Sequence, residues 1–171
     1  MTGPMPQPGE VTIVEVGPRD GLQNEPKRLA VEDRVRLING LSLTGLRRIE
    51  AASFVHPGAV PQMADADKVM RSIVRAPGTE YVALAPNVVG AARALDAGAD
   101  SLAFVISASE THNLRNVRMS REASLAEFCR VSALARGAGV RLRSYIATAF
   151  GCPFEGTTPG EKVSGLTEAL L

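Results

Sequence analysis

The stretch VTIVEVGPRDGLQNE, residues 11–25, decides the fold of this chain. Its first part, residues 11–16, is mostly apolar and rich in β-branched side chains, which is typical of a β-strand, and Gly17-Pro18 ends it. Polar residues crowd into the loop that follows, residues 19–24. Taken alone, Asp20-Gly21 is better explained as a plain turn. The functional interpretation, a strand with chemistry at its end, therefore depends on the rest of the chain.

Composition excludes several classes of protein. The 171 residues suffice for about one domain with a substantial core. Lys and Arg number 19 against 18 Asp and Glu, so the formal net charge of +1 provides no general attraction to nucleic acid or to an anionic membrane. Tryptophan is absent and aromatic residues make up 4%, which gives few stacking platforms for single-stranded nucleic acid. We expect neither a nucleic-acid nor a membrane partner.

The N-terminus and the cysteines predict a cytoplasmic location. Residues 1–10 have neither a basic n-region nor an apolar h-region, so they read as a disordered lead-in rather than a signal peptide. The two cysteines, Cys129 and Cys152, are too few for a disulfide framework or a structural zinc site, which fits a reducing compartment.

Short apolar runs alternate with helical patterns along residues 11–171. The runs predict five strands, at residues 11–16, 46–52, 81–85, 102–106 and 140–147. Asp65, Asn87 and Ser120 stand where N-caps of the intervening helices are expected, and residues 158–161 read as a capping box that starts a last helix. We expect residues 107–119 to form a polar loop.

Strict alternation of strands and helices predicts an α/β fold with parallel strands and right-handed crossovers. An open doubly wound sheet and about five of the eight units of a TIM barrel both satisfy this pattern. Length favours the open sheet, since a complete barrel has about 250 residues. Motifs do not, because no glycine-rich phosphate loop follows any strand. A non-catalytic open-sheet binding module stays as one alternative.

Either architecture gathers the residues that follow each strand at one face. These residues are mostly polar: Arg19, Asp20, Gln23, Glu50, Ser53, Asn87, Ser107, Ser109, Glu110, His112, Thr148 and Cys152. Carboxylates beside a guanidinium suit a hard divalent cation, Mg²⁺ or Mn²⁺, next to an anion stabiliser. Such a site serves reactions that develop an enolate or an alkoxide.

Five blocks together resemble the hydroxymethylglutaryl-CoA lyases, members of the metal-dependent TIM-barrel lyases and synthases. The blocks are GPRDGLQNE (17–25), IEAASFVHPGAVPQMAD (49–65), APN (85–87), ASE (108–110) and FGCPFEG (150–156). The resemblance implies cleavage of an acyl-CoA, hydroxymethylglutaryl-CoA, to acetyl-CoA and acetoacetate. It also implies a homodimer for the complete protein. A related acyl-CoA lyase, or a condensing synthase of the isopropylmalate or homocitrate type, is the enzymatic alternative.

The resemblance also implies roles for individual residues. Asp20 would be a ligand of the metal, and Arg19 would stabilise the thioester enolate with Gln23 close by. Glu50 would lie beside the metal and orient a ligand or water. Asn87 and Ser53 would contact the substrate.

The sequence departs from the family in one respect. The family's other metal ligands, a His-x-His pair and an Asn, and its catalytic Cys lie in βα units that residues 11–171 do not contain. We therefore expect a truncated barrel with little or no activity alone. Arg48 and Glu50 share strand parity, so the sequence does not decide which of them faces the interior. Glu50 could also pair with Arg48 or Arg143 instead of serving the site. Arg141, Arg143 and Tyr145 alternate on one strand face and could reach the site or close an ion pair.

Overall fold

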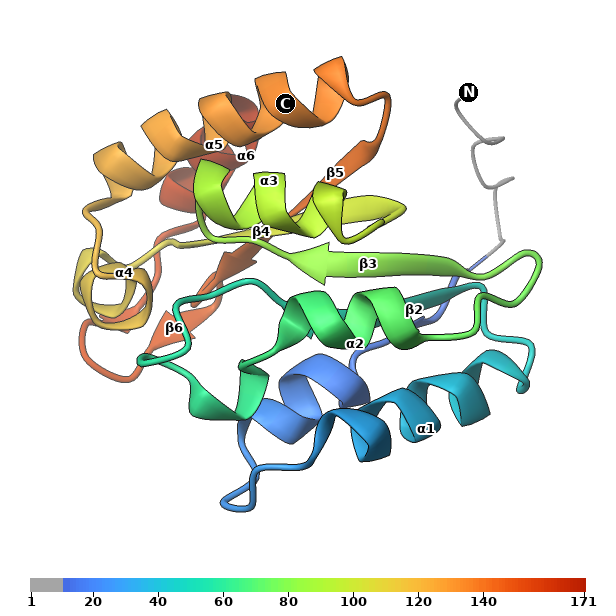
Figure 1. Cartoon of the computed structure of the whole chain (residues 1–171). Coiled ribbons are helices and arrows are strands. Elements are labelled where there is room, and N and C mark those ends of the chain that lie inside the picture. The colour runs from blue at the N-terminus through green and yellow to red at the C-terminus, as the bar shows by residue number, and fades with distance from the viewer. Residues whose placement is uncertain (1–10) are drawn as a thin grey trace.

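A computed structural model describes residues 11–171, and the lead-in expected at residues 1–10 lies outside them. Its centre is a parallel sheet whose strands are adjacent in chain order (Figure 1). These strands are β1 (Val14–Glu15), β2 (Arg48–Ser53), β3 (Glu80–Leu84), β4 (Ser101–Ser107) and β5 (Arg141–Ala147).

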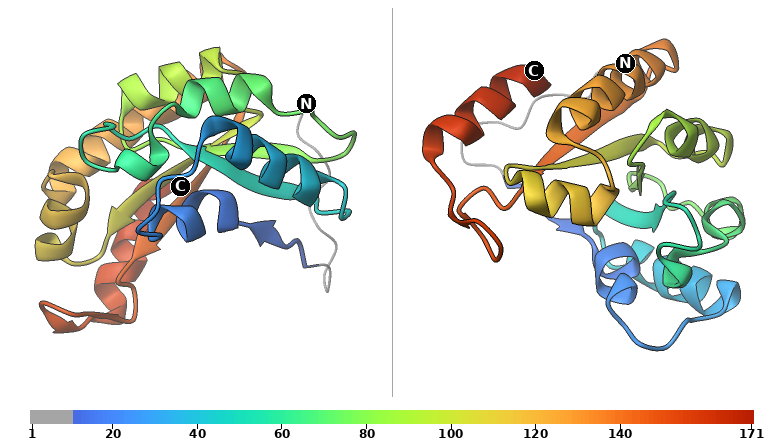
Figure 2. Two further views of the ribbon diagram at one scale, coloured as in Figure 1. Left: turned by 60° about the horizontal axis from the view of Figure 1, so that its bottom comes forward. Right: turned by 90° about the vertical axis from the view of Figure 1, so that its left-hand side faces the viewer.

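The strand order decides between the two expected architectures. A doubly wound sheet reverses its order at a switch point, whereas a barrel adds each strand beside the previous one. Here the order is β1-β2-β3-β4-β5 without reversal. The sheet curls, and the helices follow one another around its outer side (Figure 2). The expectation of consecutive TIM-barrel units is confirmed, and the alternative expectation of an open doubly wound sheet is wrong.

Helices connect the strands as the alternation predicted. They are α1 (Val31–Ser42), α2 (Ala66–Ser72), α3 (Val88–Asp96), α4 (Glu110–Val117), α5 (Arg121–Gly137) and α6 (Gly160–Leu170). A π-helical turn, η1 (Gly17–Gly21), follows β1, and a 3-10 turn, η2 (Pro61–Met63), precedes α2. A small antiparallel hairpin, β6 (Gly151–Cys152) and β7 (Gly156–Thr157), lies before α6.

Two of the expected caps are confirmed. The Asn87 side chain accepts a hydrogen bond from the Gly90 amide at 2.8 Å, and the Ser120 hydroxyl accepts one from the Ala123 amide at 3.1 Å. Each therefore satisfies an amide of the first helical turn that has no partner within the helix.

The other two caps are wrong. Asp65 has a left-handed backbone, φ 59°, and makes no side-chain cap, because its carboxylate binds Arg28 and Lys68 instead. Thr158 does not cap α6 either, since its hydroxyl donates to the carbonyl of Thr148 at 2.7 Å. In both cases the side chain that was expected to cap the helix instead makes an ion pair or a hydrogen bond with a residue outside that helix.

Residues 107–119 are not a loop, because α4 lies within them. Ser109 caps this helix by accepting from the His112 amide at 3.1 Å. The Glu155 carboxylate accepts from the Thr111 amide at 2.7 Å. This hydrogen bond is the largest of several contacts, with the side chains of Thr111 and Ser109 next, that lower the pKa of Glu155 to about 2. The sequence hides α4 because the helix is polar and buries only Asn113.

The core has two parts, one on each face of the sheet. The larger part lies between the outer face and the helices and includes Ile49, Tyr81 and Phe104. The inner cluster, on the concave face, consists of Val82, Leu84 and Ala103, with Val105 and Tyr145 packed against it. Because the helices pack on the outer face, the concave inner face is left available for a functional site.

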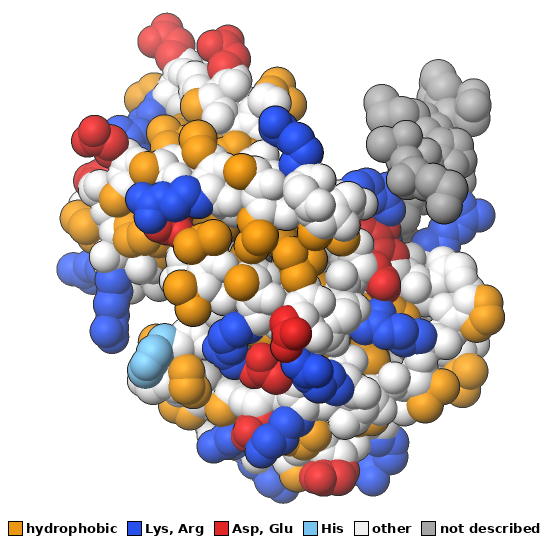
Figure 3. All heavy atoms as spheres, turned by 45° about the horizontal axis from the view of Figure 1, so that its top comes forward, with side chains coloured by type: hydrophobic (Ala, Val, Ile, Leu, Met, Phe, Trp, Pro, Cys, Tyr) orange, Lys and Arg blue, Asp and Glu red, His pale blue; other side chains and the backbone are white. Residues whose placement is uncertain are grey.

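Opposite charges are mixed on the helical face of the molecule (Figure 3). Ion pairs join α2 to α3, with Arg71 bound to Asp96 and Arg93 bound to Asp67. Within residues 11–171, none of the helices is both long and apolar enough to cross a membrane.

Candidate active site

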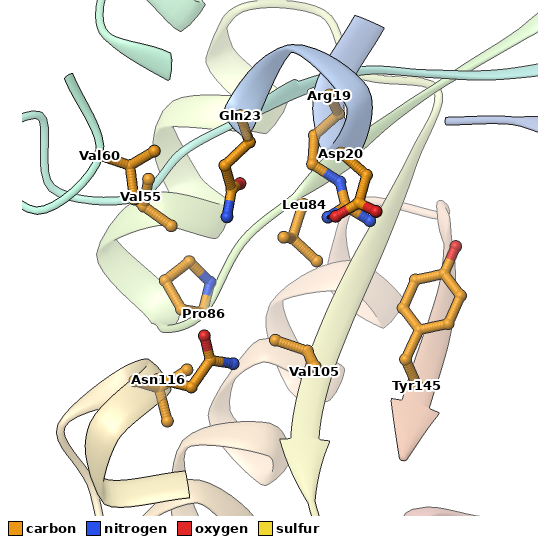
Figure 4. A pocket seen from close by; sticks show the side chains of 11 residues that line it. Arg19, Asp20, Gln23, Val55, Val60, Leu84, Pro86, Val105, Asn116 and Tyr145 are labelled. Atoms are coloured by element: carbon orange, nitrogen blue, oxygen red, sulfur yellow. Dashed lines mark hydrogen bonds and ion pairs between the residues drawn. The ribbon is translucent and has the colours of Figure 1, made fainter. Parts of the chain in front are cut away.

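The turn after β1 is a single helical turn rather than the loop expected from the sequence. The Val16 carbonyl accepts from the amides of Arg19 at 3.1 Å and Asp20 at 2.7 Å, and Pro18 is the buried residue of the turn. The Gly17 amide donates to the Glu15 carboxylate at 2.6 Å. This compact turn points the side chains of Arg19, Asp20 and Gln23 toward the inner side of the sheet (Figure 4).

A cavity of about 280 Å³ opens where these side chains point. Its polar lining comes from η1 and the residues just after it, from β5 and from α4. Its apolar lining comes from β3 and β4, from the segments that follow β2 and β3, and from α4. The residues are Arg19, Asp20, Gln23, Asn116 and Tyr145, with Val55, Val60, Leu84, Pro86, Val105 and Val117. We call it the strand-end cavity; it lies at the face where barrel enzymes place their active sites.

Glu50 links the cavity's polar residues to one another. Its side chain is fully buried and accepts from Arg19 Nε at 2.5 Å and from the Tyr145 hydroxyl at 2.7 Å. Arg19 Nη1 also donates to Asp20 Oδ1 at 2.6 Å. One charge-assisted chain thus runs Tyr145–Glu50–Arg19–Asp20, which holds the guanidinium in one orientation.

The partner of Glu50 is neither of the arginines considered from the sequence. Arg48 binds Glu80 at 2.9 Å, and Arg141 binds the same carboxylate. Arg143 stacks over the Tyr145 ring, 4.9 Å from its centroid. The two roles considered for these β5 residues are therefore both found: Arg141 forms an ion pair, and Tyr145 lines the cavity.

A β-bulge sets which side chains of β2 face inward. Glu50 and Ser53 are three residues apart, so a regular strand would point them to opposite faces. The register shifts between Glu50 and Ala52, so that Glu50 pairs with Val82 and Ser53 with Leu84. Both of those partners belong to the inner cluster. The bulge thus turns Glu50 and Ser53 to the same inner side, and Arg48 shares it.

Tyr145 keeps its proton over the whole physiological range. Burial, followed by the hydrogen bond and the charge of Glu50, raises the pKa of Tyr145 to about 12. The hydroxyl is therefore a donor to Glu50 and does not serve as a base at neutral pH.

The structure brings most of the predicted site residues together. Arg19, Asp20 and Gln23 line the strand-end cavity, and Glu50 lies directly behind Arg19. Two buried polar atoms, Gln23 Oε1 and Ser53 Oγ, have no hydrogen-bond partner among residues 11–171. Unsatisfied buried polar groups are uncommon in native proteins, and active sites are one place where they occur.

Asn87 lies slightly apart from the other predicted residues. It lines an adjoining cavity of about 460 Å³, which shares Val55, Val60 and Pro86 with the strand-end cavity. Its side-chain oxygen is occupied by the helix cap. Asn116, which lines both cavities, was not among the predicted site residues, because α4 itself was not expected.

The described residues do not form a complete divalent-metal site. Among residues 11–171, nowhere do three His, Cys, Asp or Glu side chains gather to hold a metal ion. The Asp20 carboxylate is half exposed at the cavity, with one oxygen bound to Arg19, and Glu50 is occupied by Arg19 and Tyr145. Mg²⁺ is bound through one or two carboxylates and fills its near-octahedral shell with waters, so Asp20 alone would hold it weakly.

Sequential parallel strands, helices outside the curl and a polar cluster at the strand ends define the class of TIM-barrel enzymes. The chain belongs to the HMGL-like family, whose model matches residues 10–171.

Individual relatives agree with this assignment. The chain is 48% identical over 167 residues to a Bacillus subtilis hydroxymethylglutaryl-CoA lyase. It is 44% identical over 163 residues to a Pseudomonas aeruginosa 3-hydroxy-3-isohexenylglutaryl-CoA/hydroxymethylglutaryl-CoA lyase. These matches cover 98% and 95% of this chain but only 56% and 54% of the relatives, so the chain spans about half their length.

Solved structures share the fold. The Bacillus subtilis HMG-CoA lyase superposes with a TM-score of 0.92 at 48% identity, covering 97% of this chain and 56% of that one. An Acinetobacter baumannii HMG-CoA lyase, in complex with coenzyme A and 3-methylmalate, superposes with a TM-score of 0.90 at 44% identity, covering 92% of this chain and 52% of that one.

The names of other relatives give different compartments. A Gallus gallus hydroxymethylglutaryl-CoA lyase is named as mitochondrial, and a Mus musculus 3-hydroxy-3-methylglutaryl-CoA lyase as cytoplasmic.

Proposed function

We propose that this chain supplies the Arg-Asp part of a lyase that cleaves hydroxymethylglutaryl-CoA to acetyl-CoA and acetoacetate. The observation that carries the proposal is Arg19, held at the strand-end cavity by Glu50 and Asp20. The HMGL-like family membership and the lyase relatives at 44% and 48% identity support the substrate class.

The cleavage needs an electron-pair acceptor at the thioester. A base takes the proton of the tertiary hydroxyl, and the oxygen becomes the ketone carbonyl of acetoacetate as the adjacent carbon–carbon bond breaks. The electrons of that bond form the enolate of acetyl-CoA, which an acid then protonates. The two carboxylates occupy Nε and Nη1 of Arg19, so the other N–H groups of the guanidinium can donate to that enolate oxygen. A donor fixed before the reaction stabilises the developing charge without reorganisation.

The remaining residues bind and orient in this proposal. Glu50 positions Arg19, while Gln23 and Ser53 offer unsatisfied polar atoms to the substrate. Asn87 contacts the acyl-CoA from the adjoining cavity. Asp20 would be one ligand of Mg²⁺ or Mn²⁺, and that ion would need further oxygen ligands besides it.

The proposal extends to the complete protein. We propose a homodimer located in the cytoplasm, with an acyl-CoA as its partner and neither nucleic acid nor membrane. The small net charge supports the absence of a nucleic-acid partner.

A fusion tests this function. Residues 11–171 are joined to the part of the Bacillus subtilis relative that lies beyond the match, and acetoacetate release from hydroxymethylglutaryl-CoA is measured with Mg²⁺ or Mn²⁺. We expect cleavage, and Arg19→Lys should lower it by about 10²- to 10³-fold, as for loss of one preorganised donor. Arg36→Lys, on the exposed face of α1, is the matched control and should leave it unchanged.

Two outcomes would count against the proposal. One is a folded fusion that binds CoA but leaves hydroxymethylglutaryl-CoA intact while the Bacillus enzyme cleaves it. The other is a fusion that instead condenses acetyl-CoA with a 2-oxo acid, which would favour a synthase.

A further inference from the structure

Arg34 is the largest fully buried side chain among residues 11–171. It lies on α1 and is 2% exposed, whereas the side chain of Arg36, two residues further along the same helix, is 82% exposed. A buried cation is normally paired with a carboxylate, because desolvation of an isolated charge is unfavourable. Arg34 makes no such ion pair within the described part of the chain.

Its partner is the backbone of another segment. Nη1 donates to the Ala64 carbonyl at 2.7 Å, Nη2 lies 4.0 Å from Met63 Sδ, and Nε has no hydrogen-bond partner within residues 11–171. Burial lowers the pKa of Arg34, and the charge of nearby Asp65 opposes that shift. The guanidinium is thus held in an unfavourable environment by its contacts with residues 63 and 64.

Those two residues end a segment that forms a wall of the candidate site. We call residues 54–65 the wall segment; Val55 and Val60 within it line both the strand-end cavity and the adjoining one. Its first residue is tied to the sheet, since the Phe54 amide donates to the Leu84 carbonyl at 2.7 Å. Its last residue, Asp65, has a left-handed backbone.

Between these ends the wall segment has few anchors. Its own hydrogen bonds are short-range turns, such as the Met63 amide to the Val60 carbonyl at 3.0 Å. Two exposed contacts add to these: the Gln62 side chain donates to the Glu25 carbonyl at 3.2 Å, and Arg28 binds Asp65 at 2.8 Å. Exposed contacts of this kind stabilise little, so the firm contacts at this end are the buried Met63 side chain and the Arg34 hydrogen bond to Ala64.

We infer that Arg34 is a positioning residue, which fixes the wall segment from behind and thereby sets the affinity of the two cavities for their ligand. The inference rests on the proposed function for the nature of that ligand, an acyl-CoA. A residue that acts on a site through an intermediate segment changes affinity by about tenfold.

Three variants of the 171-residue chain separate positioning from general stability. Arg34→Met keeps the length of the side chain but leaves the Ala64 carbonyl without its donor. Arg34→Lys keeps the charge and one donor, and Arg36→Met is the control on the exposed face of α1. Amide hydrogen exchange of residues 54–65 is compared with that of α5, and CoA binding is measured by calorimetric titration.

We expect Arg34→Met to accelerate exchange in the wall segment while α5 keeps its protection. CoA affinity should fall by about tenfold, Arg34→Lys should recover part of both effects, and Arg36→Met should behave as wild type. Uniform acceleration across the whole chain, or unchanged exchange in residues 54–65, would overturn the positioning role. If the wild-type chain fails to bind CoA, the proposed function loses support, while the exchange result still decides the role of Arg34.

Discussion

At the scale of single residues, Glu50 organises the candidate site. A fully buried carboxylate is unfavourable unless it is paired, and Glu50 accepts from both Arg19 and Tyr145. Arg19 comes from η1, which precedes β2 in the chain, and Tyr145 comes from β5, which follows it. The sequence singled out Glu50 and Arg19 but could not join them, because the contact spans 31 residues.

Replacement of Glu50 by Gln should lower the pKa of Tyr145. Burial would still raise that pKa above 10.0, but the charge of Glu50, which also raises it, would be lost. We expect tyrosinate absorbance from Tyr145 to appear at lower pH in Glu50→Gln than in wild type. Each protein is measured against the same protein carrying Tyr145→Phe as a blank. Identical titrations in the two backgrounds would contradict the Glu50–Tyr145 contact.

The same shift makes a stability prediction with a definite sign. The native pKa of Tyr145, about 12, exceeds the ordinary 10.0, so the native state holds the proton more tightly. The stabilisation is complete below pH 10.0 and is lost as pH rises through about 12. Urea unfolding across this window should show a smaller decline in Tyr145→Phe than in wild type.

At the scale of elements, α3 lies unusually close to the end of β2. A β-carbon on Gly90 would come within 2.6 Å of the Phe54 carbonyl oxygen, which belongs to the start of the wall segment. Glycine at this position therefore reflects tertiary packing, since it is an unfavourable residue inside a helix. The close approach brings Asn87, at the N-terminus of α3, beside the adjoining cavity.

Gly90→Ala should therefore destabilise the fold, by about 1–3 kcal/mol, because the clash is with backbone and outweighs alanine's better helix propensity. Gly165→Ala in α6 is the matched control, since nothing lies within 4 Å of its β-carbon position. That control should stabilise by about 0.5–1 kcal/mol. Urea titrations measure both; a Gly90→Ala variant as stable as Gly165→Ala would show that α3 can move away freely.

At the scale of the whole molecule, the chain forms five consecutive units of a barrel that has eight. The inner face carries a charged cluster where the strands begin, since Glu80 binds Arg48 and Arg141 there. The candidate site lies at the opposite, carboxyl ends of the strands. The chain spans about half the length of the relatives that it matches.

We expect the 171-residue chain by itself to bind Mn²⁺ weakly and to release little or no acetoacetate from hydroxymethylglutaryl-CoA. The reason is that Asp20 offers one carboxylate where a hard divalent cation needs several oxygens. Calorimetric titration with Mn²⁺ and an acetoacetate assay check this, and Asp20→Asn should abolish the remaining binding. Clear metal-dependent acetoacetate release by the purified chain would contradict it.

Much of this fold could be predicted from local pattern. The five apolar runs gave the five strands to within a few residues, and the caps at Asn87 and Ser120 mark true helix starts. Prediction failed for α4, whose polar sequence and small buried face give little periodic signal, and for the caps at Asp65 and Thr158. At the two caps, tertiary contacts with Arg28 and Thr148 outweighed the local preference.

The sequence by itself determined the alternation of strands and helices, and the RDGLQ residues at the first strand end, because both follow from local hydrophobic period and turn chemistry. Only the tertiary structure decided the sequential order of the sheet, the pairing of Glu50 with Arg19 and Tyr145, and the bulge that turns Ser53 inward. The physical reason is that strand order, register and buried ion pairs depend on contacts between residues far apart in the chain. A periodic pattern assigns a side chain to one face of a strand, but it does not name the distant residue that the side chain contacts.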